Sequence, residues 1–265
     1  EAFGFAPITS KAKVFVLMPG ASAPKMSGVS PFIMRNDPND NMVGLALADY
    51  LAKSSYKSVY TISEQTDFTD GIESVFTAQA QKNGLTITGI QKFDSKNNTD
   101  FRSILLKVKE ANPEVLFINV QTGSNLLRIA EQARQIGIKS QFVSTALGTD
   151  PAVSGGGKAV DGMIFADPPG LSSIGVGKVF VDKYKSTYNK DLSVAFYSGA
   201  SYDAVYLISQ AISAVGDDPT KVQEYMHKIP KYTGVIGTYS FDSNGDVVGI
   251  IPVFEKIVGG KLEKI

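Results

Sequence analysis

The apolar run Val14–Leu17 is followed by a turn of small and hydroxyl-bearing residues that could hold a bound anion. Gly20, Ala21 and Ser22 lie in this turn, where small side chains leave backbone N–H groups and one hydroxyl open to a ligand carboxylate. A strand that simply ends in a turn would also need glycine for its geometry, so the two interpretations are equally open on local grounds. The turn is therefore a candidate carboxylate-binding site.

Phe68 is an aromatic residue in a polar segment between the apolar run Ser58–Ile62 and a helical pattern. Its ring could form a stacking wall for an apolar ligand, or it could pack onto the following helix as a hydrophobic staple. Two further segments rich in Gly, Ser and Thr, Gln121–Ser124 and Thr145–Thr149, follow later apolar runs in the same way. Polar segments that recur at successive strand ends indicate a ligand-binding edge more strongly than any single segment does.

The aromatic residues Phe196, Tyr197, Tyr202 and Tyr206 could line a cleft in the second half of the chain. Tyr202 and Tyr206 have helical spacing, which places both on one face of a helix. For these two tyrosines the sequence therefore predicts core packing rather than ligand contact.

The composition leaves few groups for catalysis or metal binding, because the 265 residues include no cysteine, one histidine and no tryptophan. This excludes thiol nucleophiles, disulfides, cysteine-based zinc sites and histidine clusters. His227 lies in a polar helical pattern and is expected at the surface. The segment Ser154–Lys158 lacks the glycine-to-lysine spacing of a phosphate-binding loop and is expected to be a plain loop. We therefore predict no catalytic residue, no metal site and no cofactor.

Positive and negative side chains balance, since Lys plus Arg and Asp plus Glu each number 26. A balanced chain has no overall basic field to attract nucleic acid or an anionic membrane. Nucleic acid is therefore not an expected partner.

Short apolar runs alternate with helical patterns through the first half of the chain. Unbroken Val, Ile and Phe runs are typical of strands buried on both faces of a parallel sheet, with the intervening helices as covers. The alternation therefore predicts a doubly wound α/β domain, in which ligands bind beyond the carboxyl ends of the strands. The expected strands are Val14–Leu17, Ser58–Ile62, Leu85–Ile90, Glu114–Val120 and Gln141–Ser144, and the expected helices are Asn41–Ser55, Asp70–Asn83, Asp100–Ala111 and Asn125–Ile136.

At 265 residues, 43% of them hydrophobic, the chain is long enough to form two domains. Pro168 and Pro169, after the expected strand Met163–Ala166, cannot continue a sheet and indicate a crossing between domains. The pair Asn244-Gly245 predicts a tight hairpin turn. The later helices are expected at Val176–Tyr188, Ser198–Val215 and Thr220–Ile229.

The ordered set of these segments resembles the periplasmic substrate-binding proteins of bacterial ABC transporters, in the family that binds hydrophobic, branched-chain amino acids. Each segment alone is a weak signal, but their order along nearly the whole chain is specific. The segments that carry the resemblance are Met18–Pro24, Phe32–Arg35, Asp67–Gly71, Ala133–Gly137, Ser201–Val205 and Gly237–Asp246.

This resemblance implies a type I periplasmic binding fold, with two lobes joined by three chain crossings and a ligand between them. Each lobe is expected to be a mostly parallel, doubly wound sheet flanked by helices. One lobe would hold residues 1–40 and 168–233, and the other residues 41–167 and 234–265. Family members carry about a hundred further residues before Glu1, and a sheet without those strands would expose an unpaired edge, so the first lobe is expected to be incomplete here.

The resemblance also implies which residues touch the ligand. They are Gly20, Ala21 and Ser22 at the ligand carboxylate, Phe68 and Thr122 at rim positions that are aromatic in relatives, and Phe196 or Tyr197 from the other lobe.

Ala146 departs from the family pattern, because amino-acid-binding members have an acidic residue there that pairs with the ligand ammonium. Burying an ammonium group without a partner would cost several kcal/mol. Ligands without an amine, such as aromatic or aliphatic carboxylates, are therefore serious candidates. Asp150 could supply the missing charge, which keeps amino acids open.

These expectations describe a non-catalytic, monomeric receptor that closes on a small carboxylated or apolar molecule and delivers it to the permease of an ABC transporter. It is expected in the periplasm or outside the cell, after removal of a signal peptide, and a lipid anchor is an open alternative. A ligand-sensing regulatory domain of the same fold is the first rival. An enzyme on a Rossmann-like sheet is the second, and it would need a glycine-rich dinucleotide turn or an acid–base pair that the sequence does not offer.

Overall fold

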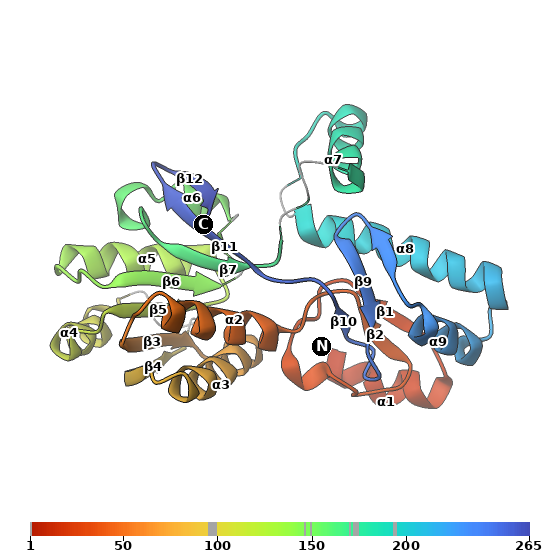
Figure 1. Ribbon diagram of the computed structural model, residues 1–265, viewed down its shortest axis with the longest axis horizontal. Helices are drawn as coiled ribbons and strands as arrows, with labels where there is room; N and C mark the ends of the chain where they lie inside the picture. Colours follow the sequence, from red (N-terminus) through yellow and green to blue (C-terminus); the bar gives the residue numbers. More distant parts are fainter. Residues whose placement is uncertain are drawn as a thin grey trace. The chain divides into compact units, whose positions relative to one another are not determined.

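The computed structural model describes residues 2–94, 100–145, 147–148, 150–169, 171, 175–192 and 195–265. The chain folds into two compact units, which Figure 1 labels element by element. Unit 1 contains Glu1–Asn39 and Pro168–Ile251, and unit 2 contains Asp40–Asp167 and Pro252–Ile265. Among the helices of the described residues, none has both the length and the apolar character that crossing a bilayer requires.

Unit 2 is built on a seven-stranded sheet with the order β12-β11-β7-β6-β5-β3-β4. The strands from β4 to β7 are parallel, and β11 and β12 add an antiparallel edge. Every residue of β5 is buried, as expected of a central strand covered on both faces. The predicted doubly wound order of this part of the chain is confirmed. The strands are β3 (Ser58–Glu64), β4 (Thr86–Phe93), β5 (Val115–Asn119), β6 (Gln141–Thr145), β7 (Ile164–Asp167), β11 (Val253–Val258) and β12 (Lys261–Lys264).

Helices cover both faces of this sheet (Figure 1). On one face, Leu47 of α2 and Phe76 of α3 belong to the same hydrophobic cluster as Phe117 of β5. On the other face, Leu105 of α4 packs in a cluster with Leu116, the neighbour of Phe117. Successive residues of β5 therefore enter opposite cores, as the pleat of a strand requires. The helices are α2 (Asp40–Lys53), α3 (Asp67–Lys82), α4 (Arg102–Ala111), α5 (Gly123–Gln135), α6 (Pro151–Ser154) and the 3-10 helix η2 (Gly157–Ala159).

Unit 1 combines a two-stranded parallel sheet, β1-β2, with a three-stranded antiparallel sheet, β10-β9-β8. Its core joins Leu207 of α8 with Leu17 of β1 and Tyr239 of β9. Asn244 and Gly245 lie in the turn between β9 and β10, where Gly245 has the positive φ of 80° that such a turn uses. The elements are α1 (Ala2–Ala12), β1 (Val16–Met18), η1 (Pro24–Met26), β2 (Ile33–Arg35), α7 (Gly175–Tyr188), α8 (Ala195–Val215), α9 (Pro219–Lys228), β8 (Tyr232–Gly234), β9 (Gly237–Phe241) and β10 (Val247–Val248).

Unit 1 differs from the prediction in two respects. Residues 234–251 were expected with residues 41–167, whereas the structure places them in unit 1, because Tyr239, Phe241 and Ile250 pack in the same core as α8. A mostly parallel sheet was expected in each lobe, but the described strands of unit 1 form only two small sheets, one of them antiparallel. The mostly parallel sheet therefore belongs to unit 2.

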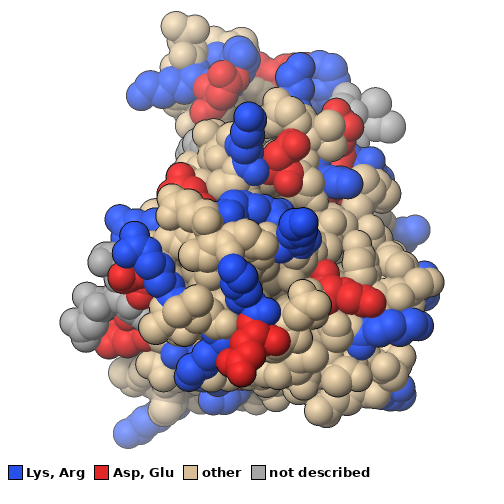
Figure 2. Space-filling view, turned by 90° about the vertical axis from the view of Figure 1, so that its left-hand side faces the viewer, with Lys and Arg blue, Asp and Glu red and all other residues tan. Residues whose placement is uncertain are grey.

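Acidic and basic side chains are interspersed on the face of the protein shown in Figure 2. This mixture agrees with the equal totals of 26 basic and 26 acidic residues. The visible face therefore carries no large area of a single sign that would attract a polyanion.

Candidate functional site

The carboxyl ends of β3 and β5 form the topological switch point of the unit 2 sheet. β3 pairs with β4 on one side and with β5 on the other, and the register places Ser63 opposite Asn119. From these strand ends the chain enters α3 and α5, which pack on opposite faces of the sheet. Ligands of open α/β sheets bind beyond the strands at such a point. The predicted residues Phe68 and Thr122 lie in the two segments that leave β3 and β5.

Phe68 lies in the first turn of α3 and is half-buried. It packs against the hydrophobic cluster that contains Ile72 and Phe76, and part of its surface remains exposed. Thr66 caps this helix, because its hydroxyl accepts a hydrogen bond from the backbone N of Thr69 at 3.2 Å. The capped helix start holds Phe68 in a defined position, and its contact with a ligand stays a prediction.

Thr122 is exposed and is the N-cap residue of α5, where its hydroxyl accepts a hydrogen bond from the Asn125 backbone N at 3.4 Å. The preceding residue, Gln121, donates its backbone N–H to the buried carboxylate of Glu64 at 2.9 Å. This contact ties the segment after β5 to the end of β3. Because a hydroxyl can donate one hydrogen bond while it accepts others, Thr122 can still donate to a ligand.

Asn119 is a site residue that the sequence analysis missed. It is fully buried at the end of β5, and its side-chain amide donates to Ser63 Oγ at 2.7 Å and to the backbone O of Thr69 at 2.8 Å. The Thr69 hydroxyl in turn donates to the backbone O of Glu64. These bonds connect the ends of β3 and β5 with the start of α3. The signal that could have identified Asn119 is a polar residue closing an otherwise apolar run.

Ala146 lies outside the described residues, so its predicted position in the site is not described. Asp150 immediately precedes α6, and its Oδ1 accepts a hydrogen bond from the backbone N of Ala152 at 2.8 Å. Its carboxylate also lies against Gly123, the first residue of α5, where an added Cβ would collide with it. A carboxylate side chain is therefore present beside the start of α5, next to Thr122.

The predicted carboxylate turn joins β1 to η1 in unit 1. Gly20 is exposed, and Ala21 and Ser22 are half-buried. Nη1 of Arg35 donates to the backbone oxygens of Ala21 at 2.7 Å and of Ala23 at 2.8 Å. A buried guanidinium on β2 therefore closes this turn.

Tyr197 lies beside the same turn, in the first helical turn of α8. A Cβ built on Gly20 would be 3.7 Å from the Cδ1 atom of Tyr197. Tyr197 is 40% exposed, whereas Phe196 is 9% exposed and belongs to the core of unit 1. The two rings meet edge to face with their centroids 5.8 Å apart. Of the two aromatic residues expected near the ligand, Tyr197 is thus the accessible one, and Phe196 supports it from the core.

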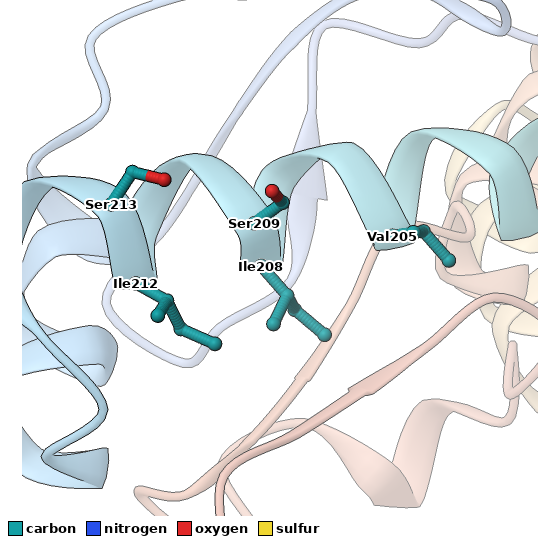
Figure 3. A pocket seen from close by; sticks show the side chains of 5 residues that line it. All are labelled: Val205, Ile208, Ser209, Ile212 and Ser213. Carbon is teal, nitrogen blue, oxygen red and sulfur yellow. The ribbon is translucent and has the colours of Figure 1, made fainter.

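The outer face of α8 is exposed. Tyr202 and Tyr206 are 42% and 55% exposed, so their predicted core packing is wrong. Helical spacing shows which residues share a face, but it does not show which face is covered. Val205, Ile208 and Ile212 point to the same side of α8, along an open and mostly apolar groove (Figure 3). None of the predicted ligand-binding residues that the structure describes lines this groove.

Asp246 pairs with Arg35 in unit 1, with Nε and Oδ1 2.6 Å apart and both side chains almost fully buried. Burial acts to raise the pKa of the Asp246 carboxyl, but the hydrogen bonds from Arg35 and Ser27 and the charge of Arg35 together hold that pKa below its usual value of 3.8. The carboxylate form is therefore stabilised in the folded protein. Arg35 is the cation that faces it.

This lowered pKa predicts a specific acid sensitivity. Asp246 stabilises the fold fully above pH 3.8, its usual pKa, and loses that contribution as the pH falls through its lower folded pKa. We expect Asp246→Asn to lower the free energy of unfolding at pH 7 and to reduce the difference in stability between pH 5 and pH 3. Urea unfolding at the three pH values measures this. An unchanged pH dependence in the variant would contradict the assignment.

Among the described residues, no group of three or more His, Asp or Glu side chains is placed to hold a metal ion. The turn in unit 1 and the strand ends in unit 2 each carry backbone N–H groups, hydroxyls and partly exposed aromatic surface, which are groups that small-molecule sites use.

Comparison with known proteins identifies related sequences. A family model described as periplasmic binding protein matches residues 1–254. The metabotropic glutamate receptor-like protein E of Dictyostelium discoideum is 26% identical over 237 residues, which are 82% of this chain and 29% of that protein. The Leu/Ile/Val-binding protein homolog 2 of Brucella abortus is 24% identical over 244 residues, 88% of this chain and 62% of that protein. The chain thus spans less than two-thirds of the length of either relative.

Solved structures share the fold. A leucine-binding protein of Thermotoga maritima is 26% identical with a TM-score of 0.87, over 98% of this chain and 74% of that one. A substrate-binding protein of Desulfitobacterium hafniense in complex with Leu is 20% identical, with a TM-score of 0.82 over 100% and 77% of the two chains. A solute-binding protein of Rhodopseudomonas palustris BisB5 in complex with 3,4-dihydroxybenzoic acid is 22% identical, with a TM-score of 0.84 over 100% and 74%. These likenesses confirm the predicted fold class.

Proposed function

Because the chain belongs to the periplasmic binding protein family, we propose that it is an extracytoplasmic receptor that captures a small solute for the permease of an ABC transporter. The observation that carries the proposal is the turn around Ser22, where Arg35 donates to the backbone oxygens of Ala21 and Ala23 and leaves the Ser22 N–H to a ligand. Binding would shift an open–closed equilibrium by the difference in ligand affinity between the two forms.

The ligand we propose is a small molecule with one carboxylate and an apolar body. The turn at Ser22 supplies donors for the carboxylate, and Tyr197 and Phe68 supply partly exposed aromatic surface for the apolar part. Leucine and 3,4-dihydroxybenzoic acid, the ligands of two structural neighbours, share this combination. We propose Gly20, Ala21, Thr122, Ala146 and Phe196 as the remaining positions around the ligand, with Phe196 acting from the core.

The amine separates the two ligand classes. Ala146 cannot pair with an ammonium group, and burying that group without a partner would cost several kcal/mol. Asp150 is the nearest alternative in the sequence, and its Oδ1 accepts a hydrogen bond from the backbone N of Ala152, which leaves further acceptor positions on the carboxylate. We therefore place carboxylates without an amine ahead of amino acids, with Asp150 as the residue by which amino acids could still bind.

A thermal-shift screen tests the ligand class with matched pairs. Leucine is compared with leucinamide and benzoate with benzamide, because each amide keeps the apolar body and lacks the carboxylate. A ligand at 100 times its Kd stabilises the folded state by about 2.7 kcal/mol. We expect the carboxylates, and benzoate above leucine, to raise the midpoint. The proposal fails if the amides stabilise the protein as much as the carboxylates do, or if no carboxylate stabilises it. If leucine alone raised the midpoint, amino acids would rank ahead of carboxylates without an amine.

A ligand-sensing domain is the second candidate. The Dictyostelium relative is named as a receptor-like protein, and the matched region is 29% of its length. A sensor would capture the same kind of ligand but would pass the signal to an attached domain. A transporter operon beside the gene would favour transport, and a fused output domain in the same reading frame would favour sensing.

The fold and the family are those of substrate-binding proteins, and we propose that the chain binds its ligand without converting it. We also propose that it acts as a monomer. Recovering the ligand chemically unchanged after long incubation, and light scattering of the purified chain, test these two statements. A product that disappears in Ser22→Ala would overturn the first, and a stable dimer the second.

A further inference from the structure

Arg35 is the centre of a buried polar cluster in unit 1, which we call the Arg35 clasp. It consists of Arg35, Ser27, Asp246 and the backbone oxygens of Ala21 and Ala23. Arg35 is 3% exposed and directs four N–H bonds into the clasp: Nε to Asp246, Nη1 to both backbone oxygens, and Nη2 to Ser27 Oγ at 3.0 Å. The guanidinium thus acts on the turn and on Asp246.

The clasp determines the direction of one backbone donor. In a trans peptide the C=O and N–H groups point in opposite directions, and the described chain contains no cis peptide bond. The oxygen of Ala21 points to Arg35, so the N–H of Ser22 points away from the guanidinium. Within the described part of the chain, no residue accepts a hydrogen bond from the Ser22 N–H or hydroxyl. Both groups can therefore donate to a ligand.

The far end of the clasp is fixed by the hairpin turn between β9 and β10. Oδ1 of Asp242 accepts from the backbone N of Asp246 at 3.0 Å, and the backbone N of Arg35 donates to Gly245 O at 2.9 Å. The Ser27 hydroxyl donates to the second oxygen of Asp246 and accepts from Asn39 at 3.0 Å. The guanidinium is thereby held between two anchored segments, and its position is not set by the turn alone.

We propose that Arg35 is a positioning residue for ligand capture, which holds the turn in the conformation that presents the Ser22 N–H to the ligand carboxylate. This rests on the proposed function, which assigns the turn to a carboxylate. The planar guanidinium grips two backbone oxygens and one carboxylate at once, and a lysine ammonium keeps the charge without that fork. Arg35 does not touch the ligand, so its effect on affinity passes through Ser22.

Calorimetric titrations with benzoate and with leucine test the proposal in Arg35→Lys, Ser22→Ala and the double variant. We expect Arg35→Lys to weaken binding about 10- to 100-fold, the size of loss found when an outer residue that orients a metal ligand is changed. The double variant should lose less than the product of the two single losses, because Arg35→Lys misplaces Ser22 and with it the hydroxyl that Ser22→Ala removes, whereas the Ser22 N–H is kept in both single variants. Arg102→Lys, at a side chain 65% exposed, is the matched control and should bind like the original chain. If the loss of affinity in the double variant equalled the product of the two single losses, the proposal would be overturned.

Hydrogen exchange of the ligand-free protein separates this proposal from the proposed function. We expect peptides covering residues 16–26 to exchange faster in Arg35→Lys, with peptides from α8 unchanged. If the original chain bound neither benzoate nor leucine, the proposed ligand would fail, and the exchange result would still decide whether Arg35 holds the turn. Should Arg35→Lys not fold, Ser27→Ala leaves Arg35 and Asp246 in place and should show the same changes at smaller size. Unchanged exchange and unchanged affinity would overturn the proposal.

Discussion

Replacing Asp203 by alanine is expected to destabilise unit 1 by about 2 to 6 kcal/mol, because it leaves two buried N–H donors without an acceptor, at about 1 to 3 kcal/mol each. Asp203 lies on α8 and is 1% exposed. Its carboxylate accepts hydrogen bonds from the backbone N of Val235 at 2.8 Å and of Ile236 at 3.1 Å. These donors lie between β8 and β9, so Asp203 is the polar anchor of that sheet on the helix. Without it, two buried N–H groups have no acceptor.

The space around Asp203 supports this expectation. Gly234 packs so closely that a Cβ there would collide with the carboxylate, and the Tyr239 hydroxyl lies 3.5 Å from it.

Burial raises the pKa of Asp203, although its hydrogen bonds act to lower it. Because the folded pKa lies above the usual value of 3.8, the titration of Asp203 favours the folded state most below pH 3.8, and this contribution is lost as the pH rises through the folded pKa. The pH dependence is therefore opposite to that of Asp246.

Urea unfolding at pH 7 measures the effect, with Asp217→Ala as the matched control. Asp217 is exposed, and its replacement should change the free energy of unfolding by about 0.5 kcal/mol or less. Asp203→Asn should fall between the two variants, because its amide keeps one acceptor oxygen and turns an N–H toward the second donor. Equal stability of Asp203→Ala and Asp217→Ala would contradict the role given to the buried carboxylate.

The sheet of unit 2 could be predicted from the sequence because its signals are local. Each central strand is a run of apolar residues, each helix has its own spacing, and the doubly wound order follows from short connections. The strands β8 and β9 could not be assigned to a unit in the same way. Their attachment to α8 depends on Asp203 and on Tyr239, whose contacts join positions 36 residues apart. Nothing in a short antiparallel strand indicates which helix it will meet.

The candidate site was predictable in outline for the same reason. Phe68 and Thr122 follow strands directly, so the alternation of elements places them at a sheet edge. Arg35 and Asp246 are 211 positions apart, and their pairing is visible only after folding. Candidate ligand contacts at strand ends can thus be predicted from local patterns, whereas the residues that hold them in place depend on tertiary contacts.

Asn119→Asp should destabilise unit 2 by about 3 kcal/mol or more at pH 7, because it places a carboxylate oxygen against a backbone oxygen in a buried site. Asn119 is fully buried, and its amide now donates to Thr69 O at 2.8 Å and to Ser63 Oγ at 2.7 Å. Ser63 could turn its hydroxyl to donate to the new group, but the Thr69 oxygen could not. The start of α3, which carries Phe68, would lose its hold on β5.

The loss of stability caused by Asn119→Asp should be smaller in acid. This pH dependence distinguishes repulsion between the new carboxylate and the Thr69 backbone oxygen from a packing defect, which would not depend on pH. The introduced carboxyl would have a folded pKa above its unfolded value, so its penalty is largest at high pH and falls as the group takes up a proton and can donate to the Thr69 oxygen again. Urea unfolding at pH 7 and pH 5 measures the change, with Asn189→Asp at an exposed position as the matched control. A penalty that stayed constant between the two pH values would show that the amide fills space at the end of β5 without holding α3.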